Sequence, residues 1–175
     1  AMLFFVIFGA QVFSAFINAA DLPGEALIWI ESLNLPSLGV LSIILLFYII
    51  FGCVFSAFAL VLLTVPVFFP LILGLGLETV YDTSPENILI WFGILIVVVA
   101  EIGQITPPIG MNVFVLKSML PDVHLNTIYK GIIPFLGADL VRLALIVLFP
   151  AIVLALPDYM DQFQEHFSIM IEALF

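Results

Sequence analysis

The chain has 175 residues, of which 65% are hydrophobic and 9% are charged, and its formal net charge is −10. A soluble domain of this composition would expose apolar surface on every side, so we predict an all-α integral membrane protein with about four or five passes. The 3 lysine and arginine residues are too few for a nucleic-acid-binding surface. Cys53 is the only cysteine, which excludes an intrachain disulfide and a cysteine-rich metal site.

The first apolar run, at residues 2–17, has no basic segment in front of it. We therefore interpret it as a membrane helix and not as a signal peptide. Beyond it, Trp29 lies between Glu25 and Glu31, a mixture typical of a short helix at the membrane interface. Residues 1–37 are thus expected to form a transmembrane helix and an interfacial connection.

The apolar stretch at residues 38–73 is too short for two complete spans, which need ~40 residues and a turn. A re-entrant helical hairpin fits its length better, with a tip at residues 52–57. Both ends of such a hairpin lie on one side of the membrane, so the segments on either side of it should share a compartment. Within the second arm, Thr64 is expected to cap a carbonyl freed by one of the nearby prolines.

The distribution of charge agrees with this hairpin. Lys117 and Lys130 flank one short loop, whereas the acidic segments of the chain contain no lysine or arginine. The positive-inside rule places that loop in the cytoplasm and the acidic segments outside. The rest of the chain is then organised as a periplasmic loop at 74–87, a broken transmembrane helix at 88–119, a cytoplasmic loop and the last transmembrane helix (about 132–156) at 120–157, and an acidic periplasmic tail at 158–175.

Pro107 and Pro108 interrupt the apolar span at 88–119. Each proline removes an amide donor and clashes with the carbonyl one turn back, so a helix cannot pass through intact. Freed backbone groups at membrane depth are tolerated only inside protein or beside a wet cavity, and broken helices build ion and substrate sites in secondary transporters. The oxygens of Gln104, Thr106 and Asn112 and the flexible Gly110 suit a hard cation. A plain proline kink satisfied by neighbouring helices is the alternative.

Three charged residues fall within apolar helices and are therefore candidates for function. Glu101 precedes the break, where we favour an anchor for the unwound loop over a protonated carboxyl or a cation partner. Asp139 and Arg142 are three residues apart and share a helix face, which favours a structural salt bridge over a proton relay. Motifs of metalloproteases, serine hydrolases and phosphate-binding loops are missing from the sequence, so we expect no enzyme and no cofactor.

Residues 101–115 resemble the signature of the large membrane (M) subunit of tripartite ATP-independent periplasmic (TRAP) transporters. Residues 62–70, 128–135 and 139–142 are similar to other segments of that subunit, and the resemblance covers roughly residues 1–157. It implies an elevator-type secondary transporter of the bacterial inner membrane, coupled to sodium. Its partners would be a small membrane (Q) subunit and a periplasmic binding protein that delivers a carboxylate or sialic-acid type of organic anion.

The resemblance also assigns roles to residues. Sodium, the coupling ion, would bind at Gly52, Ser56, Thr106 and Gly110, and the wider binding set would add Ala57, Gln104, Pro107, Pro108, Ile109 and Asn112. Ser56 departs from the family pattern, in which many relatives carry an aspartate, and a neutral hydroxyl weakens the expected ion site. Gly52, Ser56 and Ala57 are small, so tight helix packing is the alternative at the tip.

The chain resembles the C-terminal half of the large subunit, with only the second of two inverted repeats. Together with a start at Ala1 instead of Met, this suggests a fragment or a split chain that is inactive without the N-terminal half of the permease. Two alternatives stay open. One is another sodium-coupled anion symporter of related fold, and the other is a membrane assembly subunit that does not transport.

Overall fold

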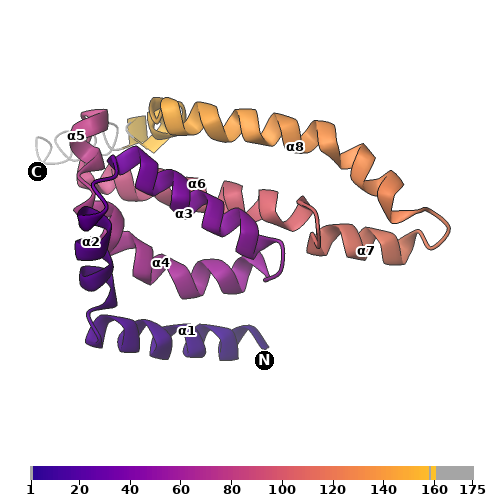
Figure 1. Ribbon diagram of the computed structural model, residues 1–175, viewed down its shortest axis with the longest axis horizontal. Helices are drawn as coiled ribbons and strands as arrows, with labels where there is room; N and C mark the ends of the chain where they lie inside the picture. The colour runs from indigo at the N-terminus through magenta and orange to yellow at the C-terminus, as the bar shows by residue number, and fades with distance from the viewer. Residues whose placement is uncertain (1, 158, 161–175) are drawn as a thin grey trace, which may run out of the picture.

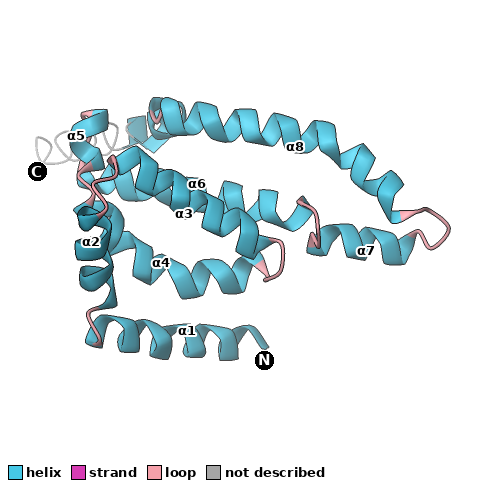
Figure 2. Ribbon diagram, in the orientation of Figure 1, coloured by secondary structure: helices cyan, strands magenta, loops and turns pink. Residues whose placement is uncertain are grey.

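A computed structural model describes residues 2–157 and 159–160, and the regular structure of these residues is entirely helical (Figures 1 and 2). The acidic tail expected at 158–175 lies outside this range except for residues 159–160. The helices are α1 (Met2–Ala19), α2 (Leu22–Ser32), α3 (Ser37–Gly52), α4 (Ala57–Gly74), α5 (Leu77–Tyr81), α6 (Pro85–Ile105), α7 (Met111–Met119) and α8 (Leu125–Leu148).

The helices form an elongated arrangement in which α6 and α7 follow one another along the long axis (Figure 1). Helix α8 runs back along them, and α3 and α4 form a hairpin whose turn lies beside the end of α6. Helix α1 lies along the outer side of α4, and the chain bends by 60° between α1 and the short helix α2. The short helix expected after the first span is therefore present.

The helical hairpin expected at 38–73 is present as α3 and α4, joined by a turn at residues 53–56. Its two ends are held together because the Ser37 hydroxyl donates a hydrogen bond of 2.7 Å to the Leu75 carbonyl. The arms are also linked by a hydrogen bond between the Tyr48 and Thr64 hydroxyls. The hairpin is therefore present, and its re-entrant insertion into the membrane stays a prediction.

The expected role of Thr64 is wrong. Its hydroxyl donates to the Leu60 carbonyl at 2.7 Å, which in a regular helix is already the acceptor for the Thr64 amide. The carbonyl that Pro66 deprives of its amide partner belongs to Leu62. Since the hydroxyl hydrogen of Thr64 is used in this bond, Tyr48 must be the donor in the bond between the arms.

Helix α6 is the centre of the core. Its buried side chains, among them Trp91, Phe92 and Leu95, pack with Leu41 and Tyr48 of α3. The end of α8 is fastened to this core by two hydrogen bonds to its backbone. The Trp91 indole donates to the Ile146 carbonyl at 2.9 Å, and the Tyr81 hydroxyl donates to the Val147 carbonyl at 2.7 Å.

The last helix differs from the span expected at 132–156. Helix α8 begins at Leu125 and ends at Leu148, and residues 151–157 are again helical. The interruption lies at Phe149, with φ −130° and ψ 75°, because the ring of a proline disfavours the helical conformation for the residue before it. The apolar run hid this break, since Pro150 is surrounded by residues that suit a membrane helix.

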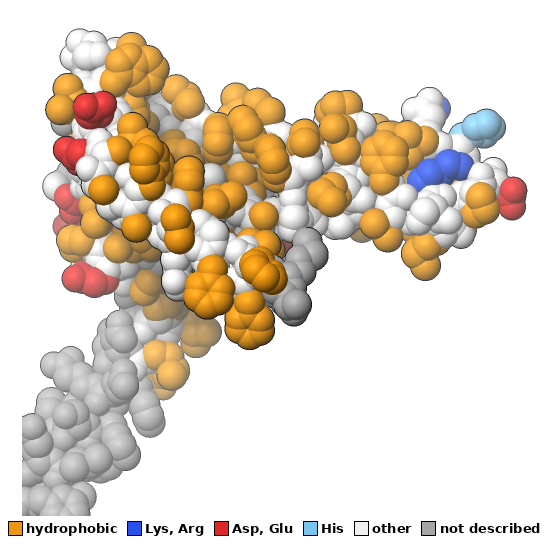
Figure 3. All heavy atoms as spheres, turned by 90° about the horizontal axis from the view of Figure 1, so that it is seen from below, with side chains coloured by type: hydrophobic (Ala, Val, Ile, Leu, Met, Phe, Trp, Pro, Cys, Tyr) orange, Lys and Arg blue, Asp and Glu red, His pale blue; other side chains and the backbone are white. Residues whose placement is uncertain are grey.

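Length and composition make three of the described helices able to cross a membrane, namely α4, α6 and α8, and the bent pair α1–α2 could form a fourth span. Charges separate along the long axis (Figure 3). Acidic side chains gather at the end that carries α2 and α5. The lysines lie near the α7–α8 turn at the opposite end, beside an acidic side chain, and hydrophobic side chains lie between the two ends. This separation is what a chain oriented across a membrane by the positive-inside rule would have.

Candidate functional site

A groove of about 500 Å³ lies where the hairpin tip meets the broken helix. It is lined by the start of α4, the last turns of α6 and the start of α7: Ala57, Phe58, Val61, Val97, Ala100, Glu101, Gln104 and Asn112. Three residues of the predicted binding set, Ala57, Gln104 and Asn112, are therefore brought to one groove from both segments. Their role in binding stays a prediction.

Two glycines bring the hairpin tip against α6. A Cβ atom built on Gly103 would lie 2.7 Å from the Gly52 Cα atom and 2.9 Å from the Ile49 carbonyl oxygen. Real Cβ atoms do not approach other atoms this closely, so the backbones of α3 and α6 touch only because both residues lack a side chain. This contact gives Gly52 the packing role that was the alternative to ion binding. Sequence analysis missed Gly103, although it lies within the motif at 101–115.

The glycine contact has an electrostatic consequence. Gly52 is the last residue of α3, and Gly103 lies in the last turn of α6. The last four carbonyls of a helix have no amide partner within it, and together they carry a negative partial charge. The C-terminal ends of α3 and α6, each with a negative partial charge, therefore lie side by side next to the break.

The break itself is folded tightly around Gly110, which adopts the left-handed conformation with φ +56°. A Cβ atom on Gly110 would lie 3.1 Å from the Gln104 carbonyl oxygen and 3.2 Å from the Thr106 carbonyl oxygen. Both carbonyls thus converge on the glycine. The Thr106 hydroxyl donates to the Ile102 carbonyl at 2.6 Å, which leaves its oxygen able to accept or to coordinate.

The exposed stretch Pro107–Ile109 is held by a residue that sequence analysis did not single out. The hydroxyl of Tyr129, in the second turn of α8, lies 2.9 Å from both the Pro108 and the Ile109 carbonyl oxygens. Tyr129 falls in the segment at 128–135 that resembles the family. Nothing in the sequence, however, indicates a partner about twenty residues away.

Ser56, expected at the ion site, and Glu101, expected to anchor the loop, are both exposed. Ser56 is exposed at the N-cap of α4, and among the described residues its hydroxyl makes no hydrogen bond. Glu101 is exposed and does not anchor the loop, so that expectation is wrong. Its carboxylate lies 3.8 Å from the Arg142 guanidinium, which is also 3.1 Å from the carboxylate of Asp139. The expected Asp139–Arg142 pair is thus present within α8, and Glu101 extends it to α6.

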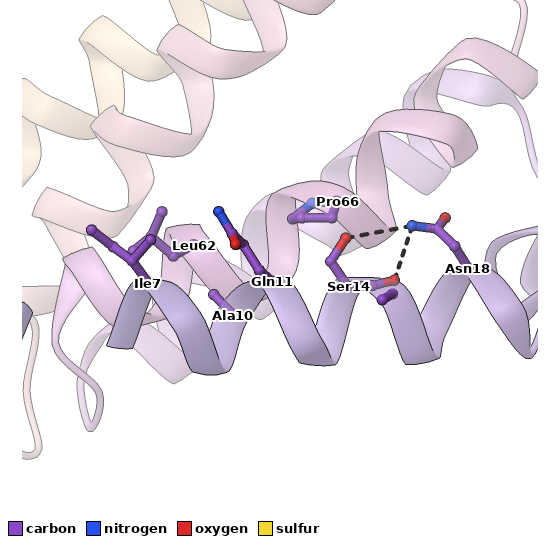
Figure 4. A pocket seen from close by; sticks show the side chains of 8 residues that line it. Ile7, Ala10, Gln11, Ser14, Asn18, Leu62 and Pro66 are labelled. Atoms are coloured by element: carbon purple, nitrogen blue, oxygen red, sulfur yellow. Dashed lines mark hydrogen bonds between the residues drawn. The ribbon is translucent and has the colours of Figure 1, made fainter. Parts of the chain in front are cut away.

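A second cavity, of about 430 Å³, lies between α1 and α4 (Figure 4). Its polar side chains come from one face of α1: Gln11, Ser14 and Asn18. The Asn18 amide donates to the Ser14 carbonyl at 2.9 Å, so this bond stays within α1. The opposite wall of the cavity, formed by Leu62 and Pro66 of α4, is apolar.

Comparison with known proteins places this chain among transporters. Residues 1–152 match the family described as "Tripartite ATP-independent periplasmic transporter, DctM component". The chain is similar to the C4-dicarboxylate TRAP transporter large permease protein DctM of Pseudomonas aeruginosa, with 31% identity over 91% of this chain and 35% of the relative. It is also similar to the sialic acid TRAP transporter large permease protein SiaM of Vibrio cholerae, with 28% identity over 90% of this chain and 34% of the relative.

A third relative is the isethionate TRAP transporter permease protein DctMQ of Oleidesulfovibrio alaskensis, with 26% identity over 87% of this chain and 22% of the relative. No solved structure matches the chain. The chain spans about a third or less of the length of these relatives. Because the family match covers nearly all of it and its helices are apolar and long, the chain belongs to the TRAP transporter large permease family and is an integral protein of the inner membrane.

Proposed function

We propose that the chain is part of a TRAP large permease that takes up an organic anion together with sodium. The observation that carries this proposal is the groove between the hairpin tip and the broken helix formed by α6 and α7. Its lining includes Ala57, the first residue of α4, and Asn112, in the first turn of α7. Helix N-termini present free amides and a positive partial charge, so two of them at one groove favour an anion.

The polar side chains of the groove fit this ligand class. The amides of Gln104 and Asn112 can donate hydrogen bonds to a carboxylate or a sulfonate. Glu101 also lines the groove, and the nearby guanidinium of Arg142 offsets part of its negative charge. The relatives are named for C4-dicarboxylates, sialic acid and isethionate, and all three substrates are anions.

The cation would bind where the hairpin tip meets the break, beside the groove proposed for the anion. The carboxyl ends of α3 and α6 meet at the Gly52–Gly103 contact, and the Gln104 and Thr106 carbonyls converge on Gly110. The carbonyls of Ile49, Ile50 and Phe51 at the end of α3 already accept from amides of the following turn. The candidate ligands are therefore the carbonyls of the break, a kind of ligand that suits sodium in broken-helix transporters. Ion and anion would then share one junction, so that binding of each favours binding of the other by charge.

The full transporter would need further chains or segments. We propose that the rest of the large permease, including its N-terminal half, supplies the first repeat and completes the pocket. A small membrane (Q) subunit and a periplasmic binding protein would complete the transporter, and the hairpin would move with the groove in an elevator-type cycle. These assignments rest on the family and on the share of the relatives that the chain covers.

The first test is sodium-dependent thermal stabilisation of the complete large permease, purified with its small subunit, with potassium as the control. We expect a sodium-specific increase of the melting temperature. Its absence in an intact complex would favour an assembly subunit that does not transport.

The second test is uptake into proteoliposomes, driven by a sodium gradient, of a labelled C4-dicarboxylate, sialic acid and isethionate, each with its binding protein. Replacing Pro107 and Pro108 by alanine should abolish uptake while circular dichroism shows an intact helical fold, because a repaired helix removes the free carbonyls. Uptake at the original rate in this variant would refute the proposed ion site.

A further inference from the structure

Two backbone carbonyls of the break accept hydrogen bonds from a side chain in place of the helical amides they have lost. In a continuous helix the Ile109 carbonyl would accept from the amide of residue 113. At the break, the Val113 amide donates instead to the Gly110 carbonyl at 2.8 Å. The Tyr129 hydroxyl takes the place of the lost helical donor for Ile109, at 2.9 Å, and for Pro108 at the same distance.

Tyr129 is itself firmly placed by the turn that precedes it. The Lys117 ammonium, near the end of α7, donates to the Pro121 and Val123 carbonyls at 2.8 Å and 2.7 Å. These bonds fix the turn between α7 and α8. Lys117 therefore holds the turn that precedes α8, and Tyr129, in the second turn of α8, bonds to the break.

We propose that Tyr129 is a positioning residue for the ion site at the break. Its single hydroxyl hydrogen, shared between two acceptors, holds the Pro108 and Ile109 carbonyls toward α8. The carbonyls of Gln104 and Thr106, which converge on Gly110, are then the ones left for the cation. Tyr129 touches no ion in this arrangement and acts through the shape of the loop. This role rests on the sodium coupling proposed above.

The chain offers a matched control. Tyr81 also donates its hydroxyl to a backbone carbonyl of α8, that of Val147, at 2.7 Å. Tyr81 is the last residue of α5, which directly precedes the start of α6, whereas the break follows the end of α6. Tyr129→Phe and Tyr81→Phe each remove one hydroxyl that bonds to the backbone of another segment, so a merely structural effect should be similar in the two variants.

The experiment is a sodium titration of thermal stability in the complete permease, for the wild type and both variants. We expect Tyr129→Phe to raise the half-saturating sodium concentration by about 3- to 10-fold, the equivalent of one hydrogen bond. Tyr81→Phe should leave that concentration unchanged. Hydrogen exchange of the peptide covering residues 104–113 should become faster in Tyr129→Phe and not in Tyr81→Phe.

The outcomes distinguish a failure of the role of Tyr129 from a failure of the sodium-coupling proposal. If the wild type responds to sodium and Tyr129→Phe has the same half-saturating concentration, or a lower one, Tyr129 does not position the site and the coupling proposal stands. If the wild type shows no response specific to sodium, the coupling proposal fails and the role of Tyr129 falls with it. Equal shifts of the half-saturating concentration in both tyrosine variants would assign Tyr129 a general structural role and overturn the inference.

Discussion

Two contacts of the hairpin with its neighbours are built in opposite ways. Where α3 meets α6, Gly52 and Gly103 let the backbones touch, and buried side chains such as Tyr48 and Trp91 fill the rest of the contact. Where α1 meets α4, a cavity of about 430 Å³ lies between parts of the two helices, and the polar side chains of α1 face an apolar wall. The first contact fixes the geometry of the break, and the second tolerates change.

The physical difference lies in how each contact responds to a shift. A close-packed contact loses many dispersion contacts when it opens by a fraction of an ångström, so it holds one arrangement. The cavity between α1 and α4 already lacks close packing over its volume, so a small shift of α1 breaks fewer contacts there. The hairpin and α6 should therefore act as one body that carries the groove, with α1 attached to it more loosely.

The largest effect is expected from Gly103→Ala. The new Cβ atom would lie 2.7 Å from the Gly52 Cα atom, and forcing the helices apart should lower the free energy of unfolding by about 1–3 kcal/mol. Gly93→Ala is the control in the same helix, because a Cβ atom there meets nothing within 4 Å. That variant should be neutral or slightly more stable, by up to about 1 kcal/mol. Equal melting temperatures for the two variants, measured in the complete permease, would contradict the tight contact.

A smaller effect is expected from Tyr48→Phe, which removes the hydrogen bond between the two arms of the hairpin. The loss should be about 0.5–1.5 kcal/mol, the net contribution of one hydrogen bond. Thr64→Val removes the same bond from the other side, so the two substitutions should be non-additive when combined. A double variant whose loss equals the sum of the two single losses would show that the arms are not coupled through this bond.

The smallest effect is expected on the other side of the hairpin, from Gln11→Leu. Gln11 lines the cavity between α1 and α4 and makes no hydrogen bond among the described residues. Its replacement should change the free energy of unfolding by no more than about 0.5 kcal/mol. A loss comparable to that of Gly103→Ala would abolish the distinction between the two contacts.

The sequence was sufficient for the features that prolines, glycines and run lengths determine. The hairpin, its tip near Gly52, and the break at Pro107 and Pro108 are local properties of the chain, and the helices begin and end within a few residues of expectation there. The charge pattern likewise agrees with the opposite placement of acidic and basic residues. The end of α8 was the exception, because Pro150 was read as part of an apolar run.

What the sequence could not provide are contacts between segments far apart in the chain. Gly103 owes its importance to the path of α3 across α6, and Tyr129 owes its role to the position of α8 beside the break. Glu101 was assigned to the loop because it is close in sequence, whereas the structure pairs it with Arg142. Each of these depends on how whole helices cross, which local patterns do not encode.

The position of Cys53 gives the hairpin a built-in reporter. Its thiol is the only one in the sequence, follows Gly52 directly, and is 5% exposed. Its sulfur donates a hydrogen bond to the Ile49 carbonyl at 3.2 Å, so a maleimide reagent should react slowly while the tip rests on α6. Movement of the tip away from α6 would expose the thiol, so the labelling rate with and without sodium or substrate tests whether the hairpin and α6 stay together during the cycle.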